Sequence, residues 1–370
     1  MCANTNDYCA ATKNQQTTLT VLSPIAININ ETRTSSRTLF KHGDLRIIGL
    51  IAIFVLVLAI GIDLLVGDPP PWKPWKSWYE LHPTVLMGRL ARALKRYMRS
   101  SNPKIEKLNG AFLAIIVITV FAVPVCFGLW FIYTWLGFLV YVFVAPVILK
   151  FTICIKLETD GAIAVAKAIE SGNLPEARKY AHFSRRDPRD LTGPQIASSV
   201  IESMVENLTD FKLSPIIYYS FFGVSGAIAF RAVNTLDGIV GFKDPENINI
   251  GWFSATLDTI INYIPARLTT ALMIVASAVL GENYKNAWVI AQRDHAKVPS
   301  RNHGWQMAAI AGALGVQLEK PGQYVIDDQT EPLTQDKIIR ALKIRNVAII
   351  LCILIILPIF LLISPYLFPY

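Results

Sequence analysis

Long apolar stretches separated by charged segments dominate the hydropathy pattern of this chain. The first covers about residues 45–66 and the last covers 347–367. Each is long enough to cross the roughly 30 Å hydrocarbon core of a bilayer as an α-helix. The stretch 110–155 is too long for one crossing and just long enough for two, with break points near 124–128 or 133–137. It therefore predicts a tight hairpin of two helices.

Two weaker apolar stretches, 213–233 and 264–280, follow later in the chain. The segments rich in Lys and Arg should face the cytoplasm, and these are 67–109, 156–212 and 282–345. With all three on one side, the two weaker stretches must both cross the membrane or both fail to cross it. If both stretches crossed fully, the polar residues between them would lie on the side of the membrane opposite the cytoplasm. We therefore predict discontinuous or re-entrant helices that return 234–262 to a water-filled cavity within the protein.

The polar segments also predict helices. Residues 84–107 form a basic amphipathic segment that should lie along the cytoplasmic face of the membrane. The pattern then predicts a helix over 159–171, a stop at Gly172, and a further helix with Pro175 in its first turn. These segments indicate cytoplasmic helical loops between the apolar spans.

The composition agrees with a multi-pass protein of the cell membrane. The 370 residues include 53% hydrophobic and only 17% charged side chains, with a mean hydropathy of +0.41, which is too apolar for an ordinary soluble enzyme. The net charge of +8 does not indicate nucleic acid, because the basic residues gather beside the apolar stretches. The five Cys residues are scattered and indicate neither a zinc site nor a disulfide framework.

The chain is predicted to have a tail and one domain. Residues 1–44 are rich in Thr, Asn and Ser, and we expect them to form a loosely ordered N-terminal tail. Residues 45–370 are expected to form a single membrane-embedded domain that carries the function. No internal repeat divides this domain further.

Polar motifs interrupt the apolar sequence at 202–210 (Glu-Ser-Met-Val-Glu-Asn-Leu-Thr-Asp), 231–237 (Arg-Ala-Val-Asn-Thr-Leu-Asp) and 258–267 (Asp-Thr-Ile-Ile-Asn-Tyr-Ile-Pro-Ala-Arg). Carboxylates and carboxamides are costly to bury without partners. In apolar surroundings they predict a functional site. In the last motif, Pro265 fits the first turn of a helix, and Arg267 near the positive end of that helix favours an anionic ligand.

The first motif has helical spacing. Glu202, Glu206 and Asp210 recur every four residues and should share one face of a helix. Like charges in this arrangement repel by roughly 0.2–0.5 kcal/mol per pair on an exposed helix, so a cation is the natural partner. A divalent metal, an arginine from elsewhere or a substrate amine would serve. The alternative is a solvated acidic face on an amphipathic helix.

The order of these motifs resembles the adenosylcobinamide-phosphate synthase (cobinamide synthase) family of cobalamin biosynthesis. The resemblance covers about residues 45–345 and has further elements, which are Asp63 with Gly67-Asp68-Pro69, His82-Pro83, Met87-Gly88, Arg186-Asp187 and the segment 300–315. The members are integral membrane proteins. The resemblance therefore implies an all-α polytopic fold with about four to six transmembrane or re-entrant helices.

The resemblance implies a carbon–nitrogen ligase that joins adenosylcobyric acid to aminopropanol or its phosphate, driven by ATP. A carboxylate must be activated, expected as an acyl phosphate, so the site needs Mg²⁺, anion clamps and a base. The expected catalytic residues are Glu202, Glu206, Asp210, Asp237 and Asp258, the first three also as metal ligands. The expected substrate-binding residues are Asp63, Asp68, His82, Arg186, Asp187, Asn207, Asn234, Asn262, Arg267 and Asn302.

The chain departs from the family pattern at two places. Thr259 stands where a second Asp is common, so Asp258 alone would carry that duty, and Arg301-Asn302-His303 replaces Pro-Asn-Ala. The chain has no Gly-x-x-x-x-Gly-Lys-Ser/Thr loop, so ATP would bind in an atypical way. The Ala-Gly-Ala-Leu-Gly run at 311–315 could cradle phosphate, but close helix packing is favoured.

Other classes of protein remain open at this point. A membrane transporter or binding protein for a corrinoid or another polar molecule would also place polar residues in broken helices. A membrane phosphotransferase acting on lipid alcohols is disfavoured because part of its expected motif is missing. The expected partners are adenosylcobyric acid, aminopropanol phosphate, ATP and membrane lipid, and an oligomer is compatible with the sequence.

Overall fold

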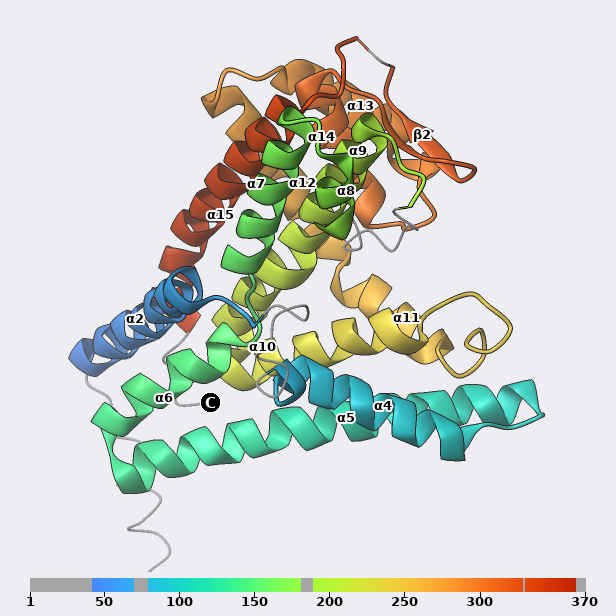
Figure 1. Ribbon diagram of the computed structural model, residues 1–370. Coiled ribbons are helices and arrows are strands. Elements are labelled where there is room, and N and C mark those ends of the chain that lie inside the picture. The colour runs from blue at the N-terminus through green and yellow to red at the C-terminus, as the bar shows by residue number, and fades with distance from the viewer. Residues whose placement is uncertain (1–41, 70–78, 181–188, 329, 364–370) are drawn as a thin grey trace, which may run out of the picture. The chain divides into compact units, whose positions relative to one another are not determined.

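The computed structural model describes residues 42–69, 79–180, 189–328 and 330–363 (Figure 1). By its internal contacts the chain divides into the units 1–42 and 43–370, and all that follows concerns the second unit. The predicted tail lies almost wholly outside the described residues.

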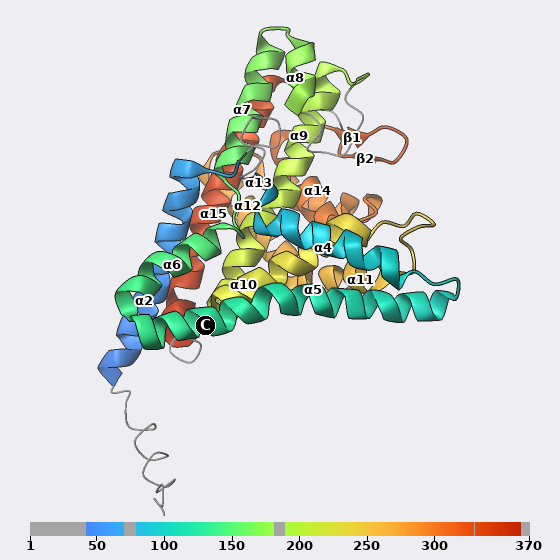
Figure 2. The same cartoon turned by 60° about the horizontal axis from the view of Figure 1, so that its bottom comes forward.

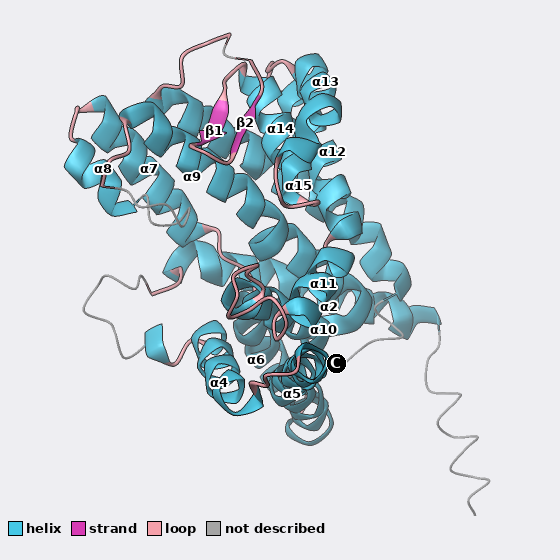
Figure 3. Ribbon diagram, turned by 90° about the vertical axis from the view of Figure 1, so that its right-hand side faces the viewer, coloured by secondary structure: helices cyan, strands magenta, loops and turns pink. Residues whose placement is uncertain are grey.

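The described part is helical apart from one pair of short strands. The α-helices are α2 (His42–Val66), α4 (Pro83–Met98), α5 (Pro103–Phe131), α6 (Phe138–Lys150), α7 (Lys156–Glu170), α8 (Leu174–Tyr180), α9 (Gly193–Leu208), α10 (Ser214–Val240), α11 (Trp252–Ile261), α12 (Tyr263–Val279), α13 (Tyr284–Asp294), α14 (His303–Leu314) and α15 (Gln335–Ile363). The π-helical segments η1 (Ile132–Leu136) and η3 (Thr209–Leu213) and the 3₁₀ turn η4 (His295–Lys297) complete the helical elements. The strands β1 (Leu318–Lys320) and β2 (Tyr324–Ile326) pair antiparallel (Figure 3).

Several of these helices are long and apolar enough to cross a membrane, which confirms the predicted fold class. By length and composition the candidates are Gly49–Val66, Pro103–Leu136, Gly193–Val240 and Gln335–Leu362. The pair α11 and α12 adds a fifth if it counts as one span, and it is bent by 45° at its break. This bent pair fits the predicted discontinuous helices, with the break at Asn262.

The predicted break within 110–155 occurs at η1. Gly137, which has a φ of 91°, separates η1 from α6, whereas Pro124 stays inside α5. The two helices diverge from this turn rather than packing along each other as a tight hairpin (Figures 1 and 2). The second motif also differs from the prediction, because α10 continues to Val240. Asn234 and Asp237 therefore lie within a helix and not in a returning loop.

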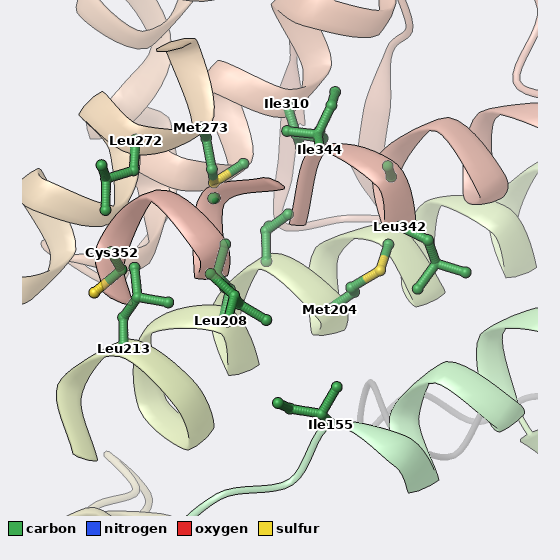
Figure 4. Packing of buried hydrophobic residues seen from close by; sticks show 14 of the residues in the cluster. Ile155, Met204, Leu208, Leu213, Leu272, Met273, Ile310, Leu342, Ile344 and Cys352 are labelled. Carbon is green, nitrogen blue, oxygen red and sulfur yellow. The ribbon is translucent and has the colours of Figure 1, made fainter. Parts of the chain in front are cut away.

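The buried apolar side chains form two clusters. The smaller one joins α4, α5 and α10 through residues such as Met87, Val117 and Leu236. These helices lie side by side at one end of the unit, together with α11 (Figures 1 and 2). The larger cluster joins α9, α12, α14 and α15, where Met204, Met273 and Ile310 are among the packed side chains (Figure 4). The helices are therefore held together mainly by apolar burial, with the polar motifs between them.

Some close contacts and bends depend on glycine. Gly223 has a φ of 67° and marks a kink within α10. At Gly312 on α14, an added Cβ would lie 2.6 Å from the backbone oxygen of Asn286 on α13, so only glycine permits this approach. The carbonyl of Gly312 accepts a hydrogen bond from the Asn286 side chain (2.9 Å). The run at 311–315 therefore serves close helix packing, as the sequence favoured.

Candidate functional site

Asn262 lies at the break between α11 and α12 and joins two acidic residues from distant parts of the chain. Its side chain is fully buried. The amide nitrogen donates to Asp258 (3.2 Å) and to Asp210 (3.3 Å), and the amide oxygen accepts the hydroxyl of Ser214 (2.8 Å). A buried carboxylate requires such donors to offset its lost hydration. We call Asp210, Asn234, Asp258, Asn262 and His303 the Asn262 cluster.

The second motif contributes Asn234 to this cluster. Its amide nitrogen donates to Asp258 (3.4 Å), while its oxygen accepts from the guanidinium of Arg231 (3.0 Å). Asp237, one turn further along α10, lies close enough for its charge to act on Asp258. The structure thus brings the three motifs, far apart in sequence, into one place.

His303 is the member of the cluster that sequence reasoning missed. Its Nε2 lies 3.3 Å from Asp210 Oδ1, and the charges of Glu206 and Asp258 also act on it. Burial alone would lower its pKa, but Asp210 outweighs this and raises the pKa of His303 to about 10. The ring is therefore protonated at neutral pH. The only sequence signal was the departure from the family pattern at 301–303.

Arg267 and Asn302 form an extension of the cluster. Arg267 Nη1 donates to Asn302 Oδ1 (2.5 Å), and Asn302 Nδ2 donates to the carbonyl of Thr259 (2.9 Å). The guanidinium lies over the ring of Tyr263, 3.8 Å from its centroid. Arg267 lies in the first turns of α12 as the sequence predicted. The side chain of Thr259 bonds within its own helix, so it does not replace a second acidic group.

A separate group, the Lys150 cluster, contains Asp63, Asp68, His82 and Lys150. Asp63 is fully buried at the end of α2 and accepts the backbone N–H groups of Ile155 (2.8 Å) and Lys156 (3.1 Å). Lys150, at the end of α6, pairs with Asp68 and lies 3.5 Å from Asp63. Sequence reasoning expected the two aspartates and His82 but missed Lys150.

The electrostatics of the Lys150 cluster keep Asp68 ionised. Burial would raise its pKa, but the nearby His82 and the charge of Lys150 lower the pKa of Asp68 to about 2. His82 caps α4, and its Nδ1 accepts the backbone N–H of Thr84 (3.3 Å). A neutral His82 therefore carries its proton on Nε2, which lies 3.4 Å from Asp68.

Glu202 lies apart from both clusters. Its carboxylate accepts the hydroxyls of Ser198 (2.5 Å) and of Tyr324 on β2 (2.6 Å). The three acidic residues therefore do not share one set of partners. The negative charges of Glu206 and Asp210 act on His303, whereas Glu202 accepts the two hydroxyls. Within the described ranges, no three His, Cys, Asp or Glu side chains gather so as to hold a metal ion. Mg²⁺ bound by all three acids stays a prediction, since this ion is usually held by one or two carboxylates plus substrate phosphates.

Glu158 is the centre of a buried ion network that sequence reasoning did not find. Glu158 Oε2 on α7 pairs with Lys212 Nζ (2.6 Å) and Arg345 Nη1 (2.9 Å). Both cations are buried almost completely. Glu158 Oε1 is buried with no hydrogen-bond partner among the described residues.

One cavity connects these groups. Its volume is about 180 Å³, and its lining comes from α7, α9, α10 and the segments around Asp68 and His82. The polar side chains on its wall include Asp68, His82, Glu158, Asn207 and Arg231. Arg231 also bonds Asn234, so it links this cavity to the Asn262 cluster.

Of the predicted residues, Arg186 and Asp187 lie outside the described part of the chain.

Together these features define a helical protein with several helices able to cross a membrane and a buried, strongly polar site among them. The CobD/Cbib protein family matches residues 56–351. The chain is 37% identical over 297 residues to the probable cobalamin biosynthesis protein CobD of Methanothermobacter thermautotrophicus, covering 80% of this chain and 94% of the relative. It is 31% identical over 298 residues to the cobalamin biosynthesis protein CobD of Dehalococcoides mccartyi, covering 80% and 92%.

The chain therefore belongs to the CobD/CbiB family of cobalamin biosynthesis proteins, which confirms the resemblance found in the polar motifs. No solved structure matches it.

Proposed function

We propose that the protein catalyses ATP-dependent amide formation between adenosylcobyric acid and aminopropanol or its phosphate. The observation that carries this proposal is the Asn262 cluster, in which two buried carboxylates and two buried carboxamides lie together with a partly buried imidazolium between apolar helices. Membership in a family of cobalamin biosynthesis proteins supplies the class of substrate. A protein with only a structural role would not require this concentration of buried polar groups.

The reaction joins two steps. A carboxylate oxygen of the corrinoid attacks the γ-phosphorus of ATP, giving an acyl phosphate and ADP. The amine nitrogen then attacks the acyl carbon, the C–N bond forms, the C–O bond to phosphate breaks, and the nitrogen loses a proton to a base. The protein must therefore orient two anionic reactants. When the amine arrives as an ammonium, its nitrogen loses one proton before the attack and a second as the amide forms.

The described residues support specific roles in these steps. Asp258 is our candidate for the base, because it is held by two carboxamides whereas Asp210 is paired with His303. Arg267, near the N-terminus of α12, is our candidate for an anion clamp. Asn302 holds that guanidinium in place through the 2.5 Å hydrogen bond. Mg²⁺, supplied with ATP, would neutralise charge on the phosphate that is transferred.

The proposal is tested by mass spectrometry of the corrinoid. Purified protein in detergent, given adenosylcobyric acid, aminopropanol phosphate and Mg·ATP, should yield adenosylcobinamide phosphate, and omission of ATP should prevent this. The Asp258→Asn variant should lose roughly 10²-fold or more in rate while remaining folded. If the corrinoid is bound but never changes mass, while proteoliposomes move it across the bilayer, the protein is a transporter.

A further inference from the structure

The cavity beside Arg231 has a size that suits only a small ligand. Its volume of about 180 Å³ lies below the range of about 300–1,000 Å³ that is typical for drug-sized ligands. A corrin ring is larger than this cavity and cannot enter it. Of the substrates in the proposed reaction, only the aminoalcohol or its phosphate has the right size.

The wall of this cavity carries both signs of charge. The acidic groups are Asp68, which pairs with Lys150, and Glu158, whose Oε2 atom pairs with two buried cations. The Oε1 atom of Glu158 is buried without a hydrogen-bond partner among the described residues. On the basic side lies Arg231, whose Nε is likewise buried and unpaired in the described structure. Leaving such atoms without a partner is costly, so a ligand with a matching donor and acceptor would be stabilised here.

The geometry of the charged groups fits a zwitterion. Asp68 follows α2, and His82 directly precedes α4. Glu158 comes from α7, and Arg231 comes from α10. His82 is buried, and its Nε2 lies 3.4 Å from Asp68, which also pairs with Lys150. The rest of the wall is apolar, with Val165 and Met204 among its residues. A short apolar body with a cation at one end and an anion at the other would match all three surfaces.

We propose that this cavity binds the amine co-substrate as a zwitterionic aminoalkyl phosphate, with its ammonium group at Glu158 and Asp68 and its phosphate at Arg231. The inference rests on the proposed function for the identity of the ligand. It assigns Glu158 and Arg231 a role in specificity that neither the motifs nor the family membership indicates. It also selects the phosphorylated amine over the free aminoalcohol, because only the phosphate supplies an anionic acceptor for the buried Nε of Arg231.

This site also lies in a productive place for the proposed reaction. Arg231 bonds Asn234 at 3.0 Å, and Asn234 bonds Asp258. A ligand whose phosphate is held at Arg231 is therefore bound next to the Asn262 cluster, where the base and the acyl group are expected. The cavity would deliver the small substrate, and the cluster would receive the large one.

Binding of the amine is measured by calorimetry, separately from turnover. The ligands are aminopropanol phosphate, aminopropanol and isopropyl phosphate, each tested alone and with adenosylcobyric acid plus a non-hydrolysable ATP analogue. Wild-type protein should bind aminopropanol phosphate at least about tenfold more tightly than either of the other ligands, since each lacks one charged contact. The Arg231→Gln variant should lose the preference over aminopropanol, and Glu158→Gln the preference over isopropyl phosphate.

Two further variants complete the test. Ala162→Leu fills the cavity without removing a charge, so it decides the question if Glu158→Gln does not fold, and it should weaken binding of aminopropanol phosphate at least about tenfold. Arg96→Gln is the matched control, because it removes an exposed arginine of α4 and should leave binding of the amine within about threefold.

The proposal is overturned if wild-type protein binds the three ligands equally or binds none of them in either condition. It is also overturned if Arg96→Gln, rather than Arg231→Gln, abolishes binding. A protein that binds the amine as expected but forms no amide would instead refute the proposed reaction and leave this site in place.

Discussion

His303 Nε2 lies 3.3 Å from Asp210 Oδ1, across 93 residues of sequence. This pair supplies from within the protein the positive charge that the acidic motif requires. Arg231 adds a second positive charge that acts on Asp210. The acidic face therefore has cationic partners without any ligand, and the sequence alone left these partners open among a metal, an arginine and a substrate amine.

The charge on His303 predicts a dependence of stability on pH. Its pKa is raised from 6.5 to about 10 in the folded state. The stabilisation it provides is complete below pH 6.5 and is lost as the pH rises through about 10, because the unfolded chain releases the proton first. The melting temperature of the wild type should therefore fall between pH 7 and 10 more steeply than that of His303→Gln. Parallel slopes for the two proteins in detergent would contradict the ion pair.

Removal of Lys150 should destabilise the fold. Lys150→Met leaves Asp63 and Asp68 without their cation, and breaking a buried ion pair on one side costs about 3–5 kcal/mol. The double variant Lys150→Met/Asp68→Asn removes one of the unpaired charges and should recover part of this loss. Unfolding by denaturant measures both variants. A double variant less stable than Lys150→Met would show that the charges do not compensate each other.

Asn262 should matter for both stability and rate. Asn262→Ala removes the donor shared by Asp210 and Asp258, which should cost about 1–3 kcal/mol of stability and also impair amide formation. The control is Asn173→Ala, because Asn173 is exposed and only caps the short helix α8. Thermal unfolding and corrinoid mass spectrometry measure the two effects. Equal results for the two variants would remove Asn262 from the site.

The orientation in the membrane remains a prediction from the basic segments. In a background without the five native cysteines, Ser171→Cys should react only with a reagent that enters the cytoplasm. Ser171 is exposed at the end of α7, so the label can reach it. Strong reaction with an impermeant external reagent would reverse the predicted topology.

The sequence by itself determined the long apolar helices, through its hydropathy pattern, and the family, through its polar motifs. Spans such as α2 and α15 follow from the length of an apolar run, which is a local property that a bilayer reads directly. The motifs that identify the family are equally local. A break in the stretch 110–155 was predictable, but the sequence left 124–128 and 133–137 open, and both contain a glycine. The structure places the break at 133–137.

Only the tertiary structure decided which polar residues share a site. Glu202 and Asp210 were expected on one face, but α9 ends at Leu208 and Asp210 lies in the wider turn of η3. The helical period that relates them therefore does not continue, and Glu202 bonds Tyr324 instead. The partners His303, Lys150 and Arg231 come from other helices, and their positions depend on how those helices pack. Spacing along one helix carries no information about which side chain of another helix approaches it.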